Sequence, residues 1–403
     1  MRVVHICPIF SELTQTFIYE LVRNMEAYGV DTHVLTWRRR NREDRPFQAV
    51  HTVQPPGRAE LARLRLNRTL PRPVENSLTL PTSFEREVAE QLRRLRPDLV
   101  HAHFGPTAVL IGRACRLAGV PMIVTFRGRD ASAKLRKWRW RRLYRRTLAG
   151  AAAVASVSPD ILARLAPVLP AGMETRVIFG GKRARDLPFR APPPPRGRAI
   201  SIGRLIEKKG HGDAIRAIAR AREQGVPATL TIVGEGPLDE HLREEIQRLG
   251  LESAVSLAGS LPYHEVVQGL QDSDFLIAAN RTAANGDREG IPNVVKEAQL
   301  IGLPIVATRH GGIPWALPEE ARADLAEEGD VEGLARRLAE LNHASVSDLA
   351  RIAEAGRDYV LREFDPWTEV QRYLDLYERI AVQDPPVTDG VGWPPATTPQ
   401  GDG

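Results

Sequence analysis

The chain has 403 residues, a formal net charge of +6 and a hydrophobic content of 42%. At roughly 150 residues per domain this length predicts two or three domains, and the ordinary composition excludes a disordered chain. No apolar run reaches the roughly 18 residues of a membrane span, and the first residues resemble a buried strand rather than a signal peptide. The two cysteines, Cys7 and Cys115, exclude a disulfide framework and a cysteine-built zinc site. We therefore expect a protein of the reducing cytoplasm.

The charge is distributed unevenly along the chain. Residues 1–190 carry a net charge of +18, whereas the remainder carries −12. This asymmetry favours a polyanionic partner for the first half, either nucleic acid or an anionic membrane face. An arginine-rich, solvated surface without a partner is the alternative.

Strands and helices are predicted to alternate through the first half of the chain. The expected strands are residues 3–7, 31–36, 99–102, 121–126 and 151–157, and the expected helices include 15–28 and 83–95. Such an alternation is typical of a parallel sheet that is covered by helices on both faces.

A proline run at residues 192–195 interrupts the alternation and predicts a stiff linker. The pattern then restarts, with strands at 199–203, 228–233, 255–258, 275–278 and 304–308, and helices at 212–224, 238–249, 265–271, 292–301 and 331–341. We therefore predict two doubly wound, Rossmann-like α/β domains that face a cleft. Ligands of such sheets bind beyond the carboxyl ends of the strands.

The segment from residue 287 to residue 297 carries the sharpest chemistry. Pro292 suits the first position of a helix, where its missing N–H is not needed, and Gly290 lets backbone approach a ligand. The start of such a helix is an anion site. Glu289 and Glu297 flank this site, and carboxylates there suit the hydroxyl groups of a ribose and a hexose. Surface glutamates on an ordinary helix are the alternative.

Two glycine turns precede this segment at the same predicted sheet edge. Gly203-Arg204 is followed by Lys208 and Lys209, and this combination of an arginine fork and lysine charges suits a diphosphate. The second turn, Val-Gly-Glu-Gly-Pro at 233–237, matches a loose G-x-G pattern.

Taken in order, these motifs resemble the family 4 retaining glycosyltransferases of GT-B fold. The resemblance rests on Gly-Arg-Leu-Ile-Glu-Lys-Lys-Gly-His (203–211), on the second glycine turn, on Glu-Gly-Ile-Pro followed by Lys-Glu-Ala (289–298), and on residues 302–314. In the first half, residues 13–18 and His-Ala-His-Phe-Gly at 101–105 are similar to segments of exopolysaccharide and colanic-acid members.

The resemblance implies a retaining transferase. It would move a hexosyl group from a nucleotide-diphosphate sugar to a hydroxyl of a glycan or lipid-linked acceptor, through front-face substitution. The implied roles are the donor diphosphate for Arg204, Lys209, Gly290, Ile291, Pro292 and Asn293, the donor sugar for Glu289, the ribose for Glu297, and the nucleobase for Leu261 and Pro262. The expected units are an acceptor-side domain at 1–190, a linker at 191–197, a nucleotide-sugar domain at 198–365, a helix at 366–382 that crosses back, and a disordered tail at 383–403.

No cofactor and no metal are expected. Asp272-Ser-Asp274 matches the D-x-D pattern that other sugar transferases use for a metal ion. It lies where a predicted helix meets the next strand, at the sheet edge opposite the site. We therefore interpret it as a structural turn.

Three positions depart from the family pattern. Arg127 stands where members carry a histidine near the donor sugar, and because arginine is no base at neutral pH, we expect charge stabilisation or acceptor binding. His103, which shares a strand face with His101, is the catalytic residue expected to compensate. Trp315 replaces a glutamate, and Phe-Gly-Gly-Lys at 179–182 replaces the usual Asn-Gly-Val-Asp.

Residues 134–146 hold eight cations and no acid, interleaved with aromatic residues. A basic helix with aromatic residues suits an anionic membrane interface, so this block is a candidate contact with the inner face of the cell membrane or a lipid-linked acceptor. The residues of this candidate surface are Lys134, Arg136, Lys137, Trp138, Arg139, Trp140, Arg141 and Arg142. A solvated helix is one alternative; nucleic acid is the other, and no nucleic-acid motif accompanies the block.

Two other functions remain open from the sequence. A nucleotide-sugar epimerase shares the fold but needs acid and base carboxylates in the first domain, which the motifs do not supply. A degenerate, non-catalytic transferase would act as a membrane-associated partner. The presence of Glu289, Glu297, Arg204 and Lys209 favours the transferase.

Overall fold

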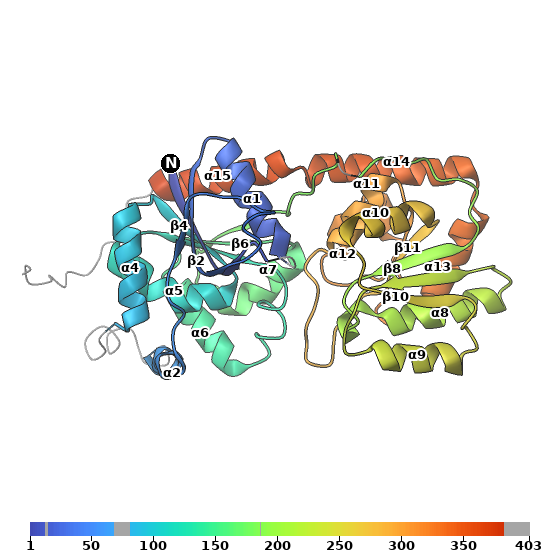
Figure 1. Cartoon of the computed structure of the whole chain (residues 1–403), viewed down its shortest axis with the longest axis horizontal. Coiled ribbons are helices and arrows are strands. Elements are labelled where there is room, and N and C mark those ends of the chain that lie inside the picture. Colours follow the sequence, from blue (N-terminus) through green and yellow to red (C-terminus); the bar gives the residue numbers. More distant parts are fainter. Residues whose placement is uncertain (13–14, 68–80, 186, 383–403) are drawn as a thin grey trace, which may run out of the picture.

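The computed structural model describes residues 1–12, 15–67, 81–185 and 187–382, with backbone alone for 63–67 and 382. Leu13 and Thr14 of the first-half motif, and the predicted tail, lie outside the described residues. The described part consists of two α/β units joined by a linker and by a pair of C-terminal helices (Figure 1).

Strand residues of the first domain alternate between two apolar cores. In β5 (Met122–Phe126), Val124 and Phe126 face one core, whereas Ile123 faces another on the opposite side. A parallel sheet buried on both faces requires helices on both sides. Helices α4 (Ser83–Leu95), α5 (Gly105–Ala118) and α6 (Trp138–Leu148) supply one layer, and α1 (Thr16–Ala27) belongs to the other.

The first sheet has seven parallel strands in the order β3-β2-β1-β4-β5-β6-β7. The other strands are β1 (Arg2–Phe10), β2 (Asp31–Arg39), β3 (Val50–Thr52), β4 (Leu99–His103), β6 (Ala153–Ser156) and β7 (Glu174–Val177). The remaining helices are α2 (Arg58–Asn67), α7 (Pro159–Leu165) and the 3-10 turn η2 (Ala166–Val168).

The second sheet has five parallel strands in the order β10-β9-β8-β11-β12. They are β8 (Arg198–Ile202), β9 (Thr229–Val233), β10 (Val255–Gly259), β11 (Phe275–Ala278) and β12 (Ile305–Ala307). The helices are η3 (Glu207–Lys209), α8 (His211–Glu223), α9 (Asp239–Arg248), α10 (Tyr263–Asp272), α11 (Asn293–Ile301), α12 (Ile313–Ala316), η4 (Glu320–Arg322), α13 (Val331–His343) and α14 (Val346–Glu363).

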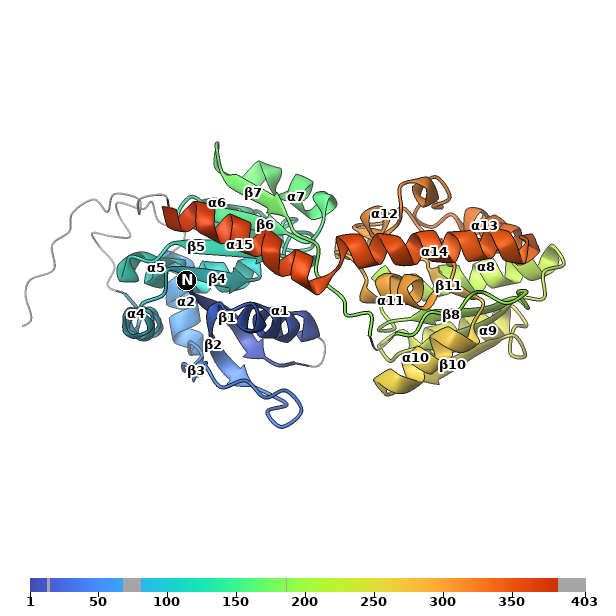
Figure 2. The same ribbon diagram turned by 90° about the horizontal axis from the view of Figure 1, so that it is seen from above.

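The last helix, α15 (Pro366–Val382), returns to the first domain. It continues the line of α14. Helix α14 lies along the second domain, and α15 lies along the first (Figure 2). Tyr373 and Tyr377 are completely buried against the first sheet. The Tyr377 hydroxyl lies 2.6 Å from His101 Nδ1, and the Tyr373 hydroxyl lies 3.1 Å from Thr125 Oγ1. Helix α15 therefore completes the core of the first domain, although the strands of that domain lie within residues 2–177.

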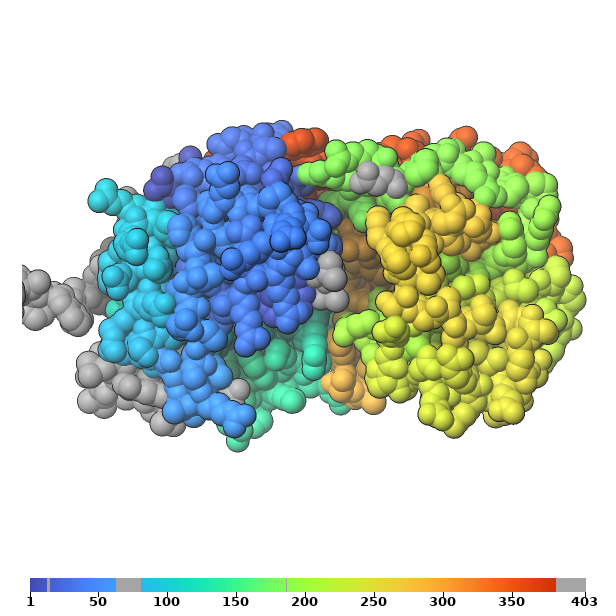
Figure 3. All heavy atoms as spheres, in the orientation of Figure 1, coloured from blue at the N-terminus to red at the C-terminus, as the bar shows by residue number. Residues whose placement is uncertain are grey.

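The chain enters the second domain before the expected boundary at residue 190. Leu187 is buried in a core of the second domain, and the Arg190 N–H donates to the Ile301 carbonyl at 2.7 Å. These contacts fix the segment before the proline run to the second domain. A furrow separates the two halves on the face shown in Figure 3.

The Asp272-Ser-Asp274 motif lies between α10 and β11, at the amino ends of the strands. Asp274 is buried and accepts from the backbone N–H groups of Arg196 and Arg198 at 2.9 and 3.0 Å. The Arg198 guanidinium also contacts Asp274 Oδ1 at 2.8 Å. The carboxylate therefore fastens the end of the linker to the second sheet.

Asp274→Asn is expected to destabilise the second domain by about 2–3 kcal/mol, because it weakens a charged, buried hydrogen-bond acceptor. Asp272→Asn, at an exposed position, is the matched control and should change stability by less than about 0.5 kcal/mol. Chemical denaturation of both variants checks this. Equal stability of the two variants, with loss of a metal-dependent activity in both, would support the metal-binding interpretation instead.

Candidate active site

The predicted donor-binding residues lie around the carboxyl ends of the second sheet, whereas His103, Arg127 and the basic block belong to the first domain. Three loops meet there, after β8, β11 and β12, and the second of them leads into α11. The Gly312 N–H donates to the Gly290 carbonyl at 2.6 Å, and a Cβ on Gly312 would lie 2.2 Å from the same oxygen. The glycine pair at 311–312 is therefore needed for close packing under the residue-290 loop.

Glu289 lies between two lysines. Its Oε1 is 2.5 Å from Lys209 Nζ, and its Oε2 is 3.4 Å from Lys208 Nζ. Burial opposes the charge of Glu289, but the two ammonium groups outweigh this effect and lower its pKa to about 2. Lys208 also reaches Asp287 at 3.5 Å. The lysines expected to bind the diphosphate are thus paired with the carboxylate expected to meet the sugar.

His310 fixes the backbone of Glu289, a role that the sequence did not reveal. The Glu289 N–H donates to His310 Nε2 at 3.1 Å, and His310 Nδ1 contacts Glu328 Oε1 at 2.7 Å. Burial lowers the pKa of His310, so the neutral ring donates from Nδ1 and accepts at Nε2. Glu328 also accepts from the Thr282 N–H and from Arg288. The histidine, followed by the glycine pair, was visible in the sequence, but its partner Glu328 is distant along the chain.

The N-terminus of α11, the predicted anion site, has no side-chain cap. The helix begins at Asn293, so Pro292 occupies the N-cap position and not the first helical position that we expected. Its backbone is extended, with φ −65° and ψ 128°, and its ring contributes no side-chain cap. The first-turn N–H groups of α11 therefore have no side-chain acceptor within the described part of the chain.

The second glutamate, Glu297, lies on α11 beside Lys182 and Tyr263. Its Oε1 lies 2.7 Å from Lys182 Nζ and 3.4 Å from the Tyr263 hydroxyl, which donates to it. Tyr263 directly follows the predicted base-adjacent residues Leu261 and Pro262, of which Leu261 is half-buried and Pro262 exposed. The structure thus brings Glu297 and the base-adjacent segment together through Tyr263.

The remaining predicted diphosphate residues lie at the surface of the same region. Arg204 is exposed, as is Asn293, whereas Ile291 is half-buried. The aliphatic part of Lys209 covers Gly203, where a Cβ would approach it to 2.9 Å. A side chain at position 203 would therefore displace Lys209 from Glu289.

The first domain approaches the site through a backbone contact. A Cβ on Gly290 would lie 2.3 Å from the Arg127 carbonyl, and one on Gly128 would lie 3.4 Å from the Gly290 nitrogen. We expected Gly290 to admit a ligand, and the structure shows that it admits the opposite domain. The Arg288 N–H also donates to Ser132 Oγ at 3.2 Å.

Arg127 lies at this contact, whereas His103 is buried inside the first domain. The Arg127 guanidinium covers the Phe17 ring at 4.2 Å from its centre, and its main-chain N–H donates to Asp130 at 3.1 Å. His103 is 0% exposed, and its Nε2 lies 3.1 Å from His5 Nδ1. Burial lowers the pKa of His103 well below its usual value. The expected catalytic contact of His103 with substrate does not fit this position, because the ring is completely buried between His5 and His101.

Three of the described histidines, His5, His101 and His103, form a group close enough to share a metal ion, and it is the one such group among the described residues. Both nitrogens of His101 already face hydroxyl groups, those of Tyr377 and Thr125, at 2.6 Å. We interpret the group as a polar network that aligns α15 on the first sheet.

The basic block forms one turn-rich segment and helix α6. Leu143, Tyr144, Thr147 and Leu148 are buried, and Trp140 is half-buried beside Lys134, whose Nζ lies 4.2 Å from the Trp140 ring centre. Trp138 is 65% exposed, and Lys137, Arg139, Arg141 and Arg142 are exposed.

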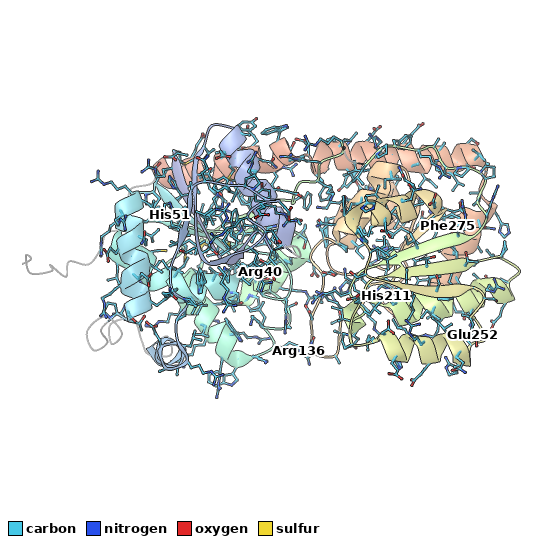
Figure 4. All side chains as sticks on the ribbon, viewed as in Figure 1. Arg40, His51, Arg136, His211, Glu252 and Phe275 are labelled. Atoms are coloured by element: carbon cyan, nitrogen blue, oxygen red, sulfur yellow. The ribbon has the colours of Figure 1, made fainter. Side chains whose placement is uncertain are left out.

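Arg136 leaves this surface and reaches across the furrow (Figure 4). Its Nη1 donates to the Ala284 carbonyl at 2.6 Å. Of the helices that the structure describes, none is both long and apolar enough to cross a bilayer.

Two facing Rossmann-like domains, each built on a parallel sheet, define the GT-B class of architecture. Residues 185–359 match the family described as "Glycosyl transferases group 1", and residues 14–178 match the "Glycosyl transferase 4-like domain". The chain belongs to this glycosyltransferase family, and the expected fold and resemblance are confirmed.

Among its relatives is the putative colanic acid biosynthesis glycosyltransferase WcaL of Escherichia coli K12. It is 31% identical over 277 residues, which cover 67% of this chain and 68% of WcaL. The amylovoran biosynthesis glycosyltransferase AmsK of Erwinia amylovora is 36% identical, over 46% of this chain and 45% of AmsK. The crystal structure of Anabaena HepE in complex with UDP has the same fold, with a TM-score of 0.71 at 18% identity, over 94% of this chain and 100% of HepE.

The acid dependence of stability tests the Glu328–His310 interaction. Burial opposes the charge of Glu328, but its hydrogen bonds outweigh this and lower its pKa to about 2, well below the unfolded value of about 4.3. Stability from such a carboxylate is present above about pH 4.3 and is lost as the pH falls towards 2.

Glu328→Gln should therefore be less stable than the wild type at neutral pH but lose less stability between pH 4.3 and 2. Denaturant unfolding at a series of pH values measures this slope. Glu327→Gln, at an exposed neighbouring position, should keep the wild-type slope. The same slope in Glu328→Gln would show that Glu328 does not titrate through this contact.

Proposed function

We propose that the chain transfers a hexosyl group from a nucleotide-diphosphate sugar to a hydroxyl of a glycan or lipid-linked acceptor, with retention and without a metal ion. The observation that carries this proposal is the arrangement around α11. Its uncapped N-terminus, Lys209, Glu289 and Glu297 lie together at the carboxyl ends of the second sheet. Phosphates suit the first two, and sugar hydroxyls suit the carboxylates.

The donor would enter by replacing an internal ion pair. Its diphosphate binds Arg204, Lys209 and the first-turn N–H groups of α11, and this frees Glu289 from Lys209 to accept hydroxyl hydrogen bonds from the hexose. Glu297 accepts from the ribose, beside Leu261–Tyr263. The energy of the lysine–glutamate contact is thereby exchanged for a lysine–phosphate contact of similar strength.

In the transfer step, the bond between the anomeric carbon and the β-phosphate oxygen breaks while an acceptor oxygen bonds to the same face of that carbon. The acceptor proton passes to the departing phosphate oxygen. Arg127 remains protonated at neutral pH, and His103 is buried, so neither is suited to take this proton. The protein's contribution is electrostatic, because fixed cations stabilise the charge that develops on the diphosphate.

A metal ion would be superfluous in this arrangement. Arg204, Lys208, Lys209 and the α11 N-terminus supply the positive charge that a divalent ion supplies elsewhere. We therefore propose full activity in the presence of a chelator.

The names of the relatives support a role in polysaccharide assembly. WcaL and AmsK are named as glycosyltransferases of colanic acid and amylovoran biosynthesis. HepE, of the same fold, was crystallised with UDP and with UDP-glucose. We propose the same donor class for this chain.

Substitutions in the donor site should separate binding from turnover. Arg204→Ala should weaken nucleotide-diphosphate binding by about 10- to 100-fold, the effect of losing a charged hydrogen bond. Glu289→Gln should lower turnover by about 100-fold or more while keeping or strengthening nucleotide binding, because Lys209 is released. Calorimetry with UDP, GDP, ADP and dTDP, and product formation with the matching sugar nucleotide, measure both quantities.

Arg243→Ala and Glu327→Gln, at exposed positions outside the proposed donor contacts, are the matched controls. Incubation with the donor alone distinguishes a transferase from an epimerase, because only an epimerase would release an isomerised sugar. Undiminished transfer by Glu289→Gln would refute the proposed role of this carboxylate.

We further propose that the basic segment around α6 contacts an anionic membrane surface, as a lipid-linked acceptor requires. Trp138 and the cations from Arg136 to Arg142 are exposed on one segment, and Arg136 connects that segment to the edge of the site. Aromatic and basic residues together favour the interface.

Lys137→Glu with Arg139→Glu should reduce binding to phosphatidylglycerol vesicles by at least about tenfold at low salt, since each cation contributes about 1 kcal/mol. Vesicle co-sedimentation measures this, with phosphatidylcholine vesicles as reference. Arg243→Glu is the control, and transfer to a soluble acceptor should persist. Equal binding by the double variant and the wild type would leave the solvated-helix interpretation.

A further inference from the structure

The interdomain linker runs from the end of β7 to the start of β8, residues 178–197, and is therefore longer than the predicted 191–197. It places a lysine beside Glu297. Lys182 lies between β7 and β8, and its backbone N–H donates to the Phe364 carbonyl at 2.8 Å. The neighbouring Gly181 N–H donates to Glu369 Oε2 at 2.8 Å, and Lys296 Nζ donates to the Gly180 carbonyl at 2.8 Å. The linker is thus held at three consecutive residues, where both connections between the domains pass.

From this fixed backbone the Lys182 side chain reaches Glu297. Its Nζ lies 2.7 Å from Glu297 Oε1, and the two side chains are 15% and 10% exposed. The ammonium also lies 5.1 Å from the centre of the Tyr263 ring, and the Tyr263 hydroxyl donates to the same carboxylate oxygen at 3.4 Å. Both contacts go to Oε1. Within the described part of the chain no side chain donates to Oε2.

This arrangement fixes one oxygen of Glu297 and leaves the other for a ligand. A carboxylate with little solvent needs a counter-charge to stay ionised, and a charged hydrogen bond also sets its orientation. Burial opposes the charge of Lys182, yet Glu297 raises the pKa of this lysine well above its ordinary value. Phe-Gly-Gly-Lys at 179–182 departs from the pattern Asn-Gly-Val-Asp, whose final acid would repel Glu297 at this place.

We propose that Lys182 is a positioning residue for the donor: it holds Glu297 so that Oε2 accepts the ribose hydroxyls, and it thereby makes recognition of the ribose depend on the interdomain linker. This inference rests on the proposed nucleotide-sugar function. Lys182 acts through Glu297 and does not itself contact the diphosphate.

Nucleotides that lack one ribose hydroxyl test this assignment. The nucleoside diphosphate that binds most tightly to the wild type is compared by calorimetry with its 2′-deoxy analogue. The wild type should prefer the ribonucleotide by about tenfold or more, the effect of one hydrogen bond to a charged acceptor. Lys182→Met should lower the affinity for the ribonucleotide towards that for the 2′-deoxy analogue. It should leave the affinity for the analogue nearly unchanged.

Four further variants distinguish positioning from a general structural effect. Lys182→Arg should restore most of the preference, because it keeps the charge. Glu297→Gln should lose the preference, and the Lys182→Met/Glu297→Gln double variant should lose nothing more, since both act on one contact. Arg243→Met, which removes an exposed cation on α9, should bind both nucleotides as the wild type does.

If Lys182→Met kept the wild-type preference for the ribonucleotide, the inference would be overturned. Equally weakened binding of both nucleotides would also overturn it, because that result indicates a phosphate contact or a distorted site. If Lys182→Met does not fold, a full preference retained by Lys182→Gln overturns it in the same way. Failure of the wild type to bind any nucleoside diphosphate would instead refute the proposed function, and the inference with it.

Discussion

Charge compensation inside a partly closed site is the constraint on which the second domain depends. Glu289 and Glu297 lie where water has little access, and each is tolerated because a lysine faces it at 2.5 or 2.7 Å. The glycines that surround them serve the same end, since they let backbone and lysine stems approach closely enough for these contacts. A polyanionic ligand can enter such a site at low electrostatic cost because it takes over cations that are already in place.

The neutral imidazole of His310 has a complementary part in this arrangement. It holds the Glu289 backbone without adding a charge that would compete for the carboxylate. Glu328 fixes which ring nitrogen carries the proton, and Arg288 joins Glu328 to the loop that meets the first domain. The position of Glu289 is therefore set from the second domain and from the domain contact together.

Local motifs predicted much of this site, and contacts between distant segments account for what they missed. The start of α11, Glu289, Glu297, Lys209 and Arg204 lie within short segments whose chemistry is visible in the residues themselves. Lys182 and Glu328 could not be assigned because their partners are far along the chain. His103 was misplaced for a related reason: strand periodicity gives the face of a side chain but not what covers that face. Pro292 differs by one position, within the ordinary uncertainty of helix ends.

Helix α15 has a consequence for the order in which the molecule is made. The first domain lacks one of its core helices until the last described residues leave the ribosome, whereas the second domain is complete some way earlier. Domains commonly fold in the order of synthesis, but here the domain that begins first must finish last. Until then, the buried histidines and strand residues under α15 are open to water, and a nascent chain must protect this face from aggregation while its partner domain is already formed.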